Sequence, residues 1–326
     1  MFVPNRRRFL SAVALASVAP ALRASAPPFP SRIVRIVVPY SVGIGPDVVS
    51  RAVGQELQRR WGQPVVIDNK PGASGIVAFN ELRQTAADGH TLFVGDTGSL
   101  AVNPLIHATL PYDVARDVAP LTTLFRATFA FHVGAKSRFQ TLGDLLAQAR
   151  REPRSVSYAS FGNGHPSHVA VESFARAAGI EMLHVPFKDS GTQLAAVANG
   201  EVDFTTLAMF TVMPLIKAGR LRPLAVAARR RLAEYPDLPT VAEAGGPMVE
   251  MRPWAGLVAR AGTPAPLLEQ IHRDVLTALM EDGVRSRIEG AGFQLAPSTP
   301  QQMHDLIVAD SAEYSVLVRE GRVQKA

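Results

Sequence analysis

The stretch IVRIVVPYSVGIGPDVVSRAVGQEL, residues 33–57, decides the fold class. Its β-branched run 33–38 predicts a strand, and a loop containing Gly43 and Gly45 leads directly into a predicted helix. This order is the setting of a glycine-rich phosphate loop, and the next predicted strand ends at Asp68, where a dinucleotide fold keeps its ribose acid. The stretch therefore predicts an α/β fold and leaves a choice between a nucleotide site and a site for another anion.

The residues after the loop disfavour a nucleotide. The dinucleotide motif needs a third glycine where the helix packs on the strand, and this chain has Val48 there. The charge of Asp47, in the first helical turn, would oppose a pyrophosphate. The loop instead predicts a carboxylate site, because a helix N-terminus offers unpaired N–H groups and the positive end of the helix dipole.

Several residue types suit this carboxylate site. Gly43 and Gly45 let the backbone approach an anion closely, and Ser41 adds a hydroxyl donor. Asp47 and Arg51 stand four residues apart on the predicted helix. They form either a helix-surface ion pair or, for Asp47, a contact with an amino group of the ligand.

A second segment, SVSYASFGNGHPSHVAVESF (residues 155–174), repeats the order of strand, small polar loop and helix. Ser160, Asn163 and Gly164 are residue types that hold an anion with backbone and hydroxyl donors. Two such loops, facing each other across a cleft, would grip one carboxylate from both sides.

Strands and helices alternate along the chain, which predicts parallel α/β sheets. Two series are joined by extended stretches near 118–134 and 248–260, so we expect two lobes with two crossovers. The predicted boundaries are 27–125 with 253–326 for the first lobe and 126–252 for the second. Small ligands bind in a cleft between lobes, at the carboxyl ends of strands.

Residues 1–26 predict an export signal. A basic head precedes an apolar stretch, residues 12–22, and small residues at 24–26. The run RRRFL at 6–10 resembles the twin-arginine export pattern, and an ordinary secretory signal with an extra arginine is the alternative. We therefore expect a periplasmic protein.

Composition argues against several classes of function. Removing the export signal takes away four arginines and no acid, so the formal net charge falls from +6 to +2. No dense basic patch for nucleic acid remains, and the arginine run 229–231 predicts a solvated face. The chain has no cysteine, which excludes disulfides and thiolate chemistry, and no apolar run of 18 residues that would predict a membrane span. We expect no cofactor and no metal.

A hydrolase is the weakest alternative. Ser160 stands between a predicted strand and a predicted helix, as the nucleophile of a hydrolase does, but that motif needs a glycine where this chain has Tyr158. His165 and His168 are spaced to share a metal, yet no further ligand is evident.

Further motifs follow one another along the chain: PSRIVRIVVPY, GQPVVIDNKPGASG, DGHTLFVG, SYASFGNGHPSH, HVPFK, GEVDF, IKAGRLRPLAV, YPDLPTVAEAG and WAGLVARAGTP. In this order they resemble the Bug family, the extracytoplasmic solute receptors of tripartite tricarboxylate transport systems, over essentially the whole length after the export signal. The resemblance implies a two-lobed periplasmic binding protein of the type II kind, a Venus flytrap that closes on an organic acid without catalysis. It also implies a monomer that works with membrane transporter subunits, and a membrane sensor is the alternative partner.

Five positions depart from the family's usual residues. Ile44 stands where the family has glycine, and His165 where it has serine or threonine. Leu207 and Ala208 stand where it often has a polar pair. Leu100 replaces a common histidine. A more apolar pocket predicts an aromatic or alkyl monocarboxylate rather than citrate. His165 would donate to the carboxylate, and a pKa near neutrality would make binding pH-sensitive. The alternative is that Ile44 and His165 compensate each other structurally or weaken the grip.

The predicted ligand-binding residues come from the two loops, from the TGS segment after the third strand and from the segment after VDF. They are Tyr40, Ser41, Gly43, Ile44, Gly45, Asp47, Thr97, Ser160, Asn163, Gly164, His165 and Leu207.

Overall fold

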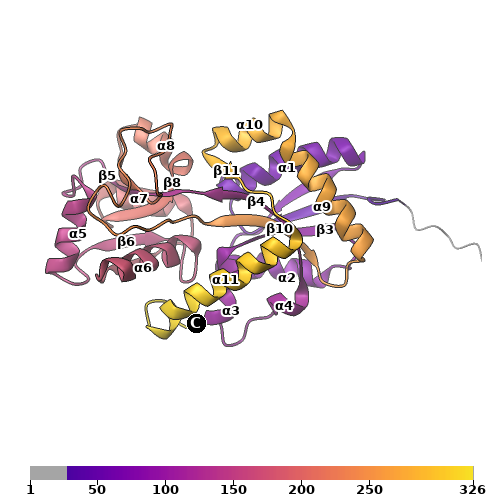
Figure 1. Cartoon of the computed structure of the whole chain (residues 1–326), viewed down its shortest axis with the longest axis horizontal. Coiled ribbons are helices and arrows are strands. Elements are labelled where there is room, and N and C mark those ends of the chain that lie inside the picture. The colour runs from indigo at the N-terminus through magenta and orange to yellow at the C-terminus, as the bar shows by residue number, and fades with distance from the viewer. Residues whose placement is uncertain (1–27, 326) are drawn as a thin grey trace, which may run out of the picture.

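The computed structural model describes residues 28–325, so the export signal predicted at 1–26 lies outside the described residues. The described residues form an elongated α/β molecule with two lobes, each built on its own sheet (Figure 1). The predicted two-lobed fold is therefore confirmed. Over this range, none of the helices combines the length and apolar character needed to cross a bilayer.

The first lobe contains the strands β1 (Val34–Val38), β2 (Val65–Asn69), β3 (Thr91–Asp96), β4 (Val118–Ala127), β10 (Trp254–Arg260) and β11 (Phe293–Leu295). They form one sheet in the order β11-β4-β10-β3-β1-β2. β1 lies between β2 and β3 and runs parallel to both, whereas β10 is antiparallel to β3 and β4.

The helical segments of the first lobe are α1 (Gly45–Trp61), η1 (Ala73–Gly75), α2 (Ile76–Gln84), the π-helical η2 (Thr97–Val102), α3 (Asn103–Ile106), α4 (Val114–Asp117), α9 (Ala265–Met280), α10 (Asp282–Gly290) and α11 (Pro300–Arg319). Side chains of β1 alternate between two cores, as a strand covered on both faces requires. Ile36 packs with residues of α1 and α9, while Val37 packs with residues of α2 and α11.

The second lobe contains the strands β5 (Phe129–Gly134), β6 (Ser157–Ser160), β7 (Leu183–Pro186), β8 (Phe204–Ala208) and β9 (Leu221–Val226). Their order is β7-β6-β8-β5-β9, with β6 parallel to both neighbours and β5 antiparallel to both. The helices are α5 (Leu142–Arg151), α6 (Pro166–Ala178), α7 (Ser190–Asn199) and α8 (Met209–Lys217). β6 thus holds the place in this sheet that β1 holds in the first.

The chain passes from the first sheet to the second at Thr128, between β4 and β5, and re-enters the first sheet at Trp254. The predicted boundaries were 125/126 and 252/253. The final helix, α11, lies along the first lobe and its C-terminal end reaches the second, where Arg176 pairs with Glu320 at 2.8 Å (Figure 1).

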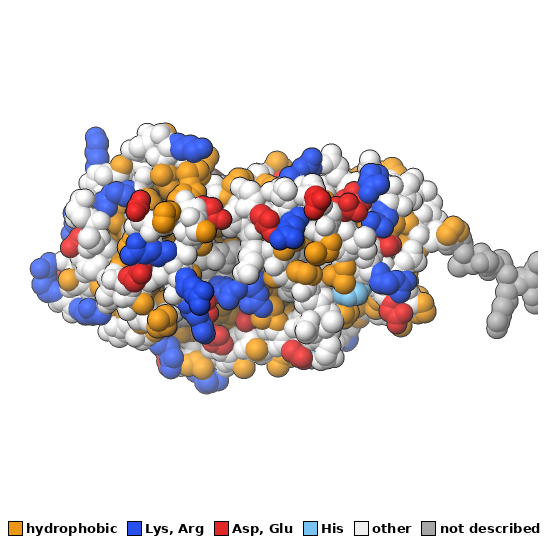
Figure 2. Space-filling model, turned by 45° about the horizontal axis from the view of Figure 1, so that its top comes forward, with side chains coloured by type: hydrophobic (Ala, Val, Ile, Leu, Met, Phe, Trp, Pro, Cys, Tyr) orange, Lys and Arg blue, Asp and Glu red, His pale blue; other side chains and the backbone are white. Residues whose placement is uncertain are grey.

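Charged side chains of both signs are interspersed over the face shown in Figure 2. In the arginine run 229–231, Arg229 pairs with Glu250 at 3.1 Å and Arg231 with Glu243 at 2.9 Å. These arginines are therefore locally balanced by acids.

Candidate ligand-binding site

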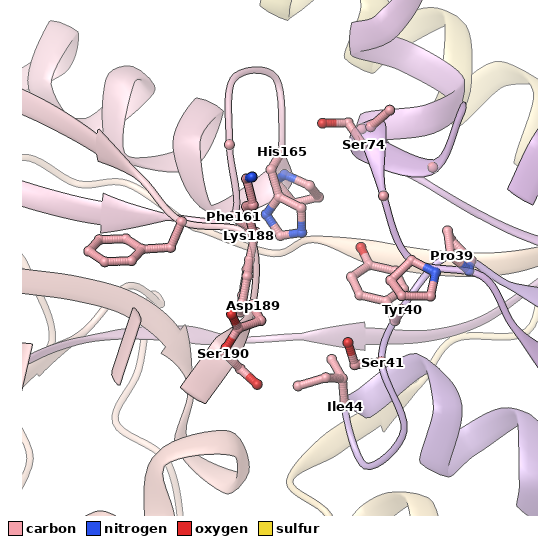
Figure 3. A pocket seen from close by; sticks show the side chains of 18 of the residues that line it. Pro39, Tyr40, Ser41, Ile44, Ser74, Phe161, His165, Lys188, Asp189 and Ser190 are labelled. Atoms are coloured by element: carbon pink, nitrogen blue, oxygen red, sulfur yellow. The ribbon is translucent and has the colours of Figure 1, made fainter. Parts of the chain in front are cut away.

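A cavity of about 570 Å³ lies between the lobes (Figure 3). Its walls are loops at the carboxyl ends of β1, β2 and β3 on one side and of β6 and β7 on the other. Parallel α/β sheets bind ligands at this edge, next to helix N-termini. Figure 3 shows Tyr40, Ser41 and Ile44 on the side of the first lobe, facing His165 and Lys188 of the second.

In the first loop, the position whose backbone conformation requires glycine is Gly43. Gly43 has a φ of +85°, in the left-handed region that favours glycine. Ile44 has φ −79° and ψ 152°, an extended conformation open to a β-branched residue, and is the N-cap residue of α1. The backbone therefore accepts isoleucine here without strain, and the Ile44 side chain lines the cavity.

Asp47 organises the first loop from within. It is 1% exposed and accepts hydrogen bonds from the backbone N–H of Gly43 at 2.9 Å and from Asn69 Nδ2 at 2.8 Å. Arg51 completes the set with an ion pair of 2.8 Å. Burial opposes ionisation, but the bonds from Arg51, Gly43 and Asn69 outweigh it and lower the pKa of Asp47. The predicted ion pair with Arg51 is thus present. Asp47 does not line the cavity, so the predicted contact with a ligand amino group lacks a geometric basis.

Gly45 is required by packing. A Cβ atom at this position would lie 2.4 Å from Cζ of Phe293, so the phenyl ring rests directly on the glycine backbone. The sequence predicted that Gly45 would let the backbone approach an anion. In the structure, the close approach is to an aromatic ring.

The second loop ends at His165, the N-cap residue of α6. Its Nδ1 accepts a hydrogen bond from the backbone N–H of Ser167 at 3.1 Å and lies 2.9 Å from the Ser167 hydroxyl. Because Nδ1 accepts, the proton of the neutral ring resides on Nε2. Nε2 is buried without a hydrogen-bond partner among residues 28–325, and the ring lines the cavity. His165 therefore carries a buried, unpaired N–H donor on a ring that lines the cavity.

Burial lowers the pKa of His165 to about 3. The ring packs edge-on against Tyr40 of the first lobe and Phe161 of the second, with ring centroids 5.9 and 4.9 Å away. The predicted pKa near neutrality is therefore wrong, because these aromatic rings exclude the water that an imidazolium needs. The ring is neutral at physiological pH.

A family model described as "Tripartite tricarboxylate transporter family receptor" matches residues 49–322. The chain belongs to this family. A protein from the tcbD-tcbE intergenic region of Pseudomonas sp. (strain P51) is 32% identical over 321 residues, covering 98% of this chain and 95% of the relative.

Two solved structures of proteins from Rhodopseudomonas palustris share the fold. Rpa4515 of R. palustris, determined with adipate, has 32% identity and a TM-score of 0.83, covering 89% of this chain and 97% of that chain. MatC of Rhodopseudomonas palustris, with bound malate, has 28% identity and a TM-score of 0.80, covering 89% and 99%. The resemblance found in the sequence is thereby confirmed.

The loops of this tripartite tricarboxylate transporter receptor are tied together at the rim of the cavity. The Ser74 hydroxyl donates to the Asn163 carbonyl at 3.2 Å, linking the lobes, and the Asn163 side chain lines the cavity and donates to the Gln324 carbonyl at 2.8 Å. Gly164 has a φ of +75°, and its N–H is taken by His168 Nδ1 at 3.1 Å. Asn163 thus borders the cavity. Gly164 does not line it, but its positive φ and its hydrogen bond to His168 fix the conformation of the loop.

Ser160 is fully buried and does not line the cavity. Its hydroxyl lies 2.6 Å from His184 Nε2, a pairing that the sequence did not predict. The hydroxyl also accepts from the Gly162 N–H at 3.0 Å. These contacts hold the turn of the second loop, and a substrate has no access to the hydroxyl.

The remaining predicted residues fall in three places. Tyr40 lines the cavity, and its hydroxyl donates to the buried carboxylate of Asp96. Leu207 lies on an apolar recess beside the cavity. Thr97 is 1% exposed and does not line the cavity.

Sequence reasoning missed several residues of the cavity wall, including Ser74, Asp96, Phe161 and Lys188. Lys188 follows the end of β7, which neighbours β6, so parallel pairing of these strands brings it to the same edge. The motif HVPFK contained this signal. In residues 28–325, Lys188 forms no ion pair within 4.0 Å, and no cluster of three or more His, Asp or Glu is arranged to hold a metal.

Proposed function

We propose that this receptor is an exported periplasmic protein that captures a small organic carboxylate between its lobes and hands it to membrane transporter subunits. Membership of the receptor family supports this role, as do the neighbours determined with adipate and malate. We further propose that it catalyses no reaction, since both serines of residues 28–325 whose hydroxyls lie beside a histidine ring, Ser160 and Ser167, are fully buried and closed to the cavity.

The observation that carries the proposal is the Nε2–H of His165. A buried donor without a partner costs free energy, and a ligand acceptor removes that cost. The donor lies at the N-terminus of α6, where the helix dipole favours negative charge. Lys188, on the same side of the cavity, adds a full positive charge. A carboxylate satisfies all three features.

Calorimetric titration of the purified protein with adipate, malate, benzoate and butanoate tests the proposal. His165→Asn is the informative variant, because asparagine is a good N-cap and keeps an acceptor for Ser167 while removing the Nε2 donor. Loss of one hydrogen bond to a charged group, about 1.5–3 kcal/mol, should weaken binding of the best ligand roughly 10- to 150-fold.

His304→Asn is the matched control, since His304 is 57% exposed in its side chain and lies outside the cavity. It should leave every affinity unchanged. Absence of binding for all four acids, or equal affinities for wild type and His165→Asn, would contradict the proposal.

The membrane partner is tested by affinity capture from a membrane extract of the source organism, with and without the best ligand. Transporter subunits should be recovered in a ligand-dependent manner. Recovery of a membrane sensor instead would replace the transport role by a signalling one.

A further inference from the structure

An apolar recess opens beside the cavity. It has a volume of about 70 Å³, and Tyr40, Ile44 and His165 line both the recess and the cavity. Beyond these shared residues the wall includes Phe125, Leu207, Trp254 and Phe293, each at most 5% exposed. The recess is therefore a continuation of the binding cavity into the apolar contact region between the lobes.

The polar groups of the recess wall are mostly engaged elsewhere. Trp254 donates its Nε1–H to Asp310 Oδ2 at 2.7 Å, and the Tyr40 hydroxyl is bound to Asp96. The hydroxyl of Thr211 and the Nε2–H of His165 remain, and no lysine or arginine lines the recess. A carboxylate placed there would lose its hydration without gaining a cation, so the recess disfavours charge.

The walls of the recess are fixed by close packing. Phe293 rests on Gly45, and its ring centroid lies 4.7 Å from that of Phe125. Neither ring can withdraw without opening a void in the core of the first lobe. The recess is thus a preformed feature, and preformed apolar pockets favour groups that match them in size.

The volume sets the size of the matching group. One water requires about 10–15 Å³ of such space, so 70 Å³ admits a few carbon atoms or the leading edge of an aromatic ring. The rest of a ligand has room in the adjoining cavity of about 570 Å³.

We propose that this receptor selects a carboxylate whose other end is a small apolar group, aryl or short alkyl. The apolar end occupies the recess, and the carboxylate accepts the Nε2–H of His165 at the junction with the cavity. This inference rests on the proposed function, because it assumes that the cavity holds a carboxylate. Adipate and malate carry a carboxylate at each end and have no apolar end to place there.

The titrations separate this inference from the proposed function. Benzoate or butanoate should bind at least 10-fold more tightly than adipate and malate. If a dicarboxylate binds as tightly as either monocarboxylate, or more tightly, and His165→Asn weakens it, the proposed function stands and the selection of an apolar end is overturned. If none of the four acids binds, both fail.

Ile44→Ser tests the recess directly. It removes apolar wall while placing a favoured N-cap residue at the start of α1, so the fold is retained. Affinity for the better monocarboxylate should fall about 10-fold, because roughly three carbon atoms leave the wall, and affinity for adipate should fall by a smaller factor because adipate has no apolar end in the recess. Equal losses for both acids, or no loss, would overturn the inference.

Val42→Ser provides the matched control. Val42 belongs to the same loop but is 70% exposed and lines neither the recess nor the cavity. Its substitution should change no affinity. Leu207→Asn, on the far wall, gives a second variant and should lower monocarboxylate affinity in the same direction as Ile44→Ser.

Discussion

The loops after β1 and β6 hold equivalent places in the two lobes and present different chemistry to the cavity. Each follows a strand that lies between two parallel neighbours, and each leads into a helix with proline in its first turn. At the N-cap position the first loop has Ile44, whose side chain makes no capping bond, and the second has His165, whose Nδ1 caps the helix.

The two loops differ in whether their polar groups form hydrogen bonds within the loop or are left without a partner. Asp47 takes up the Gly43 N–H, so the first loop satisfies itself and leaves an apolar side chain facing the cavity. His165 uses one ring nitrogen internally and leaves the other free. One backbone arrangement thus supports an apolar wall in one lobe and a hydrogen-bond donor in the other. The two loops therefore differ in the part of a ligand that each suits, Ile44 an apolar group and His165 a hydrogen-bond acceptor.

The largest expected effect of this asymmetry is on stability at acid pH. Burial lowers the pKa of His165 and His168 to about 3 and that of His132 and His184 to about 4, all in the second lobe. Below the unfolded value near 6.5, the unfolded chain binds protons that the folded chain rejects, so stability falls with pH from 6.5 down to these values. For the four histidines together the loss between pH 6.5 and 5 is on the order of 6 kcal/mol, since each contributes at most about 1.4 kcal/mol per pH unit.

Urea unfolding at pH 7 and pH 5 measures this loss. His165→Asn should reduce it by about one quarter, since one of four contributing rings is removed. The exposed-site variant His304→Asn should leave it unchanged. An identical loss in wild type and His165→Asn would show that His165 is protonated in the folded state.

The backbones of the two loops can be compared at one glycine in each, Gly43 and Gly164. Gly43 and Gly164 both have positive φ, at +85° and +75°. A Cβ at Gly43 would meet nothing within 4 Å, whereas one at Gly164 would lie 2.5 Å from Cδ1 of Ile106. Gly43→Ala should therefore cost only the conformational term, about 1 kcal/mol. Gly164→Ala adds overpacking and should cost about 3 kcal/mol.

Thermal or urea unfolding of the two alanine variants checks this difference. Equal costs would mean that Ile106 moves aside freely, and the second loop would then be no more tightly packed at Gly164 than the first is at Gly43.

The parts of the fold that the sequence predicts are the local ones. The β-branched run of β1, the glycine of its loop and the proline at the start of α1 act within a few residues of each other. β11 was not predicted, because its three residues gain their strand conformation by pairing with β4. The π-helical η2 was also missed, since it depends on the buried capping box of Asp96 and Ser99.

The binding site shows the same limit. Residue types in the two loops predicted a cavity edge, but whether a side chain faces the ligand depends on partners elsewhere in the chain. Asp47 turns inward because Asn69, at the end of β2, meets it. Position 45 needs glycine because the ring of Phe293, from the C-terminal region, packs directly against its backbone. Neither partner is identifiable from spacing alone.

The smallest expected effect is a gain. Ile44 caps α1 without a side-chain bond, although its position is one where serine accepts a hydrogen bond from the second or third residue of a helix. Ile44→Ser should raise the free energy of unfolding by about 0.5–1 kcal/mol, because the half-buried isoleucine contributes little to the core. Urea unfolding of the ligand-free protein measures the gain, with Val42→Ser as the control that should show none. A stabilised variant that binds its ligand more weakly would mean that isoleucine stands at this N-cap for the ligand; a destabilised one would assign Ile44 to packing of the loop.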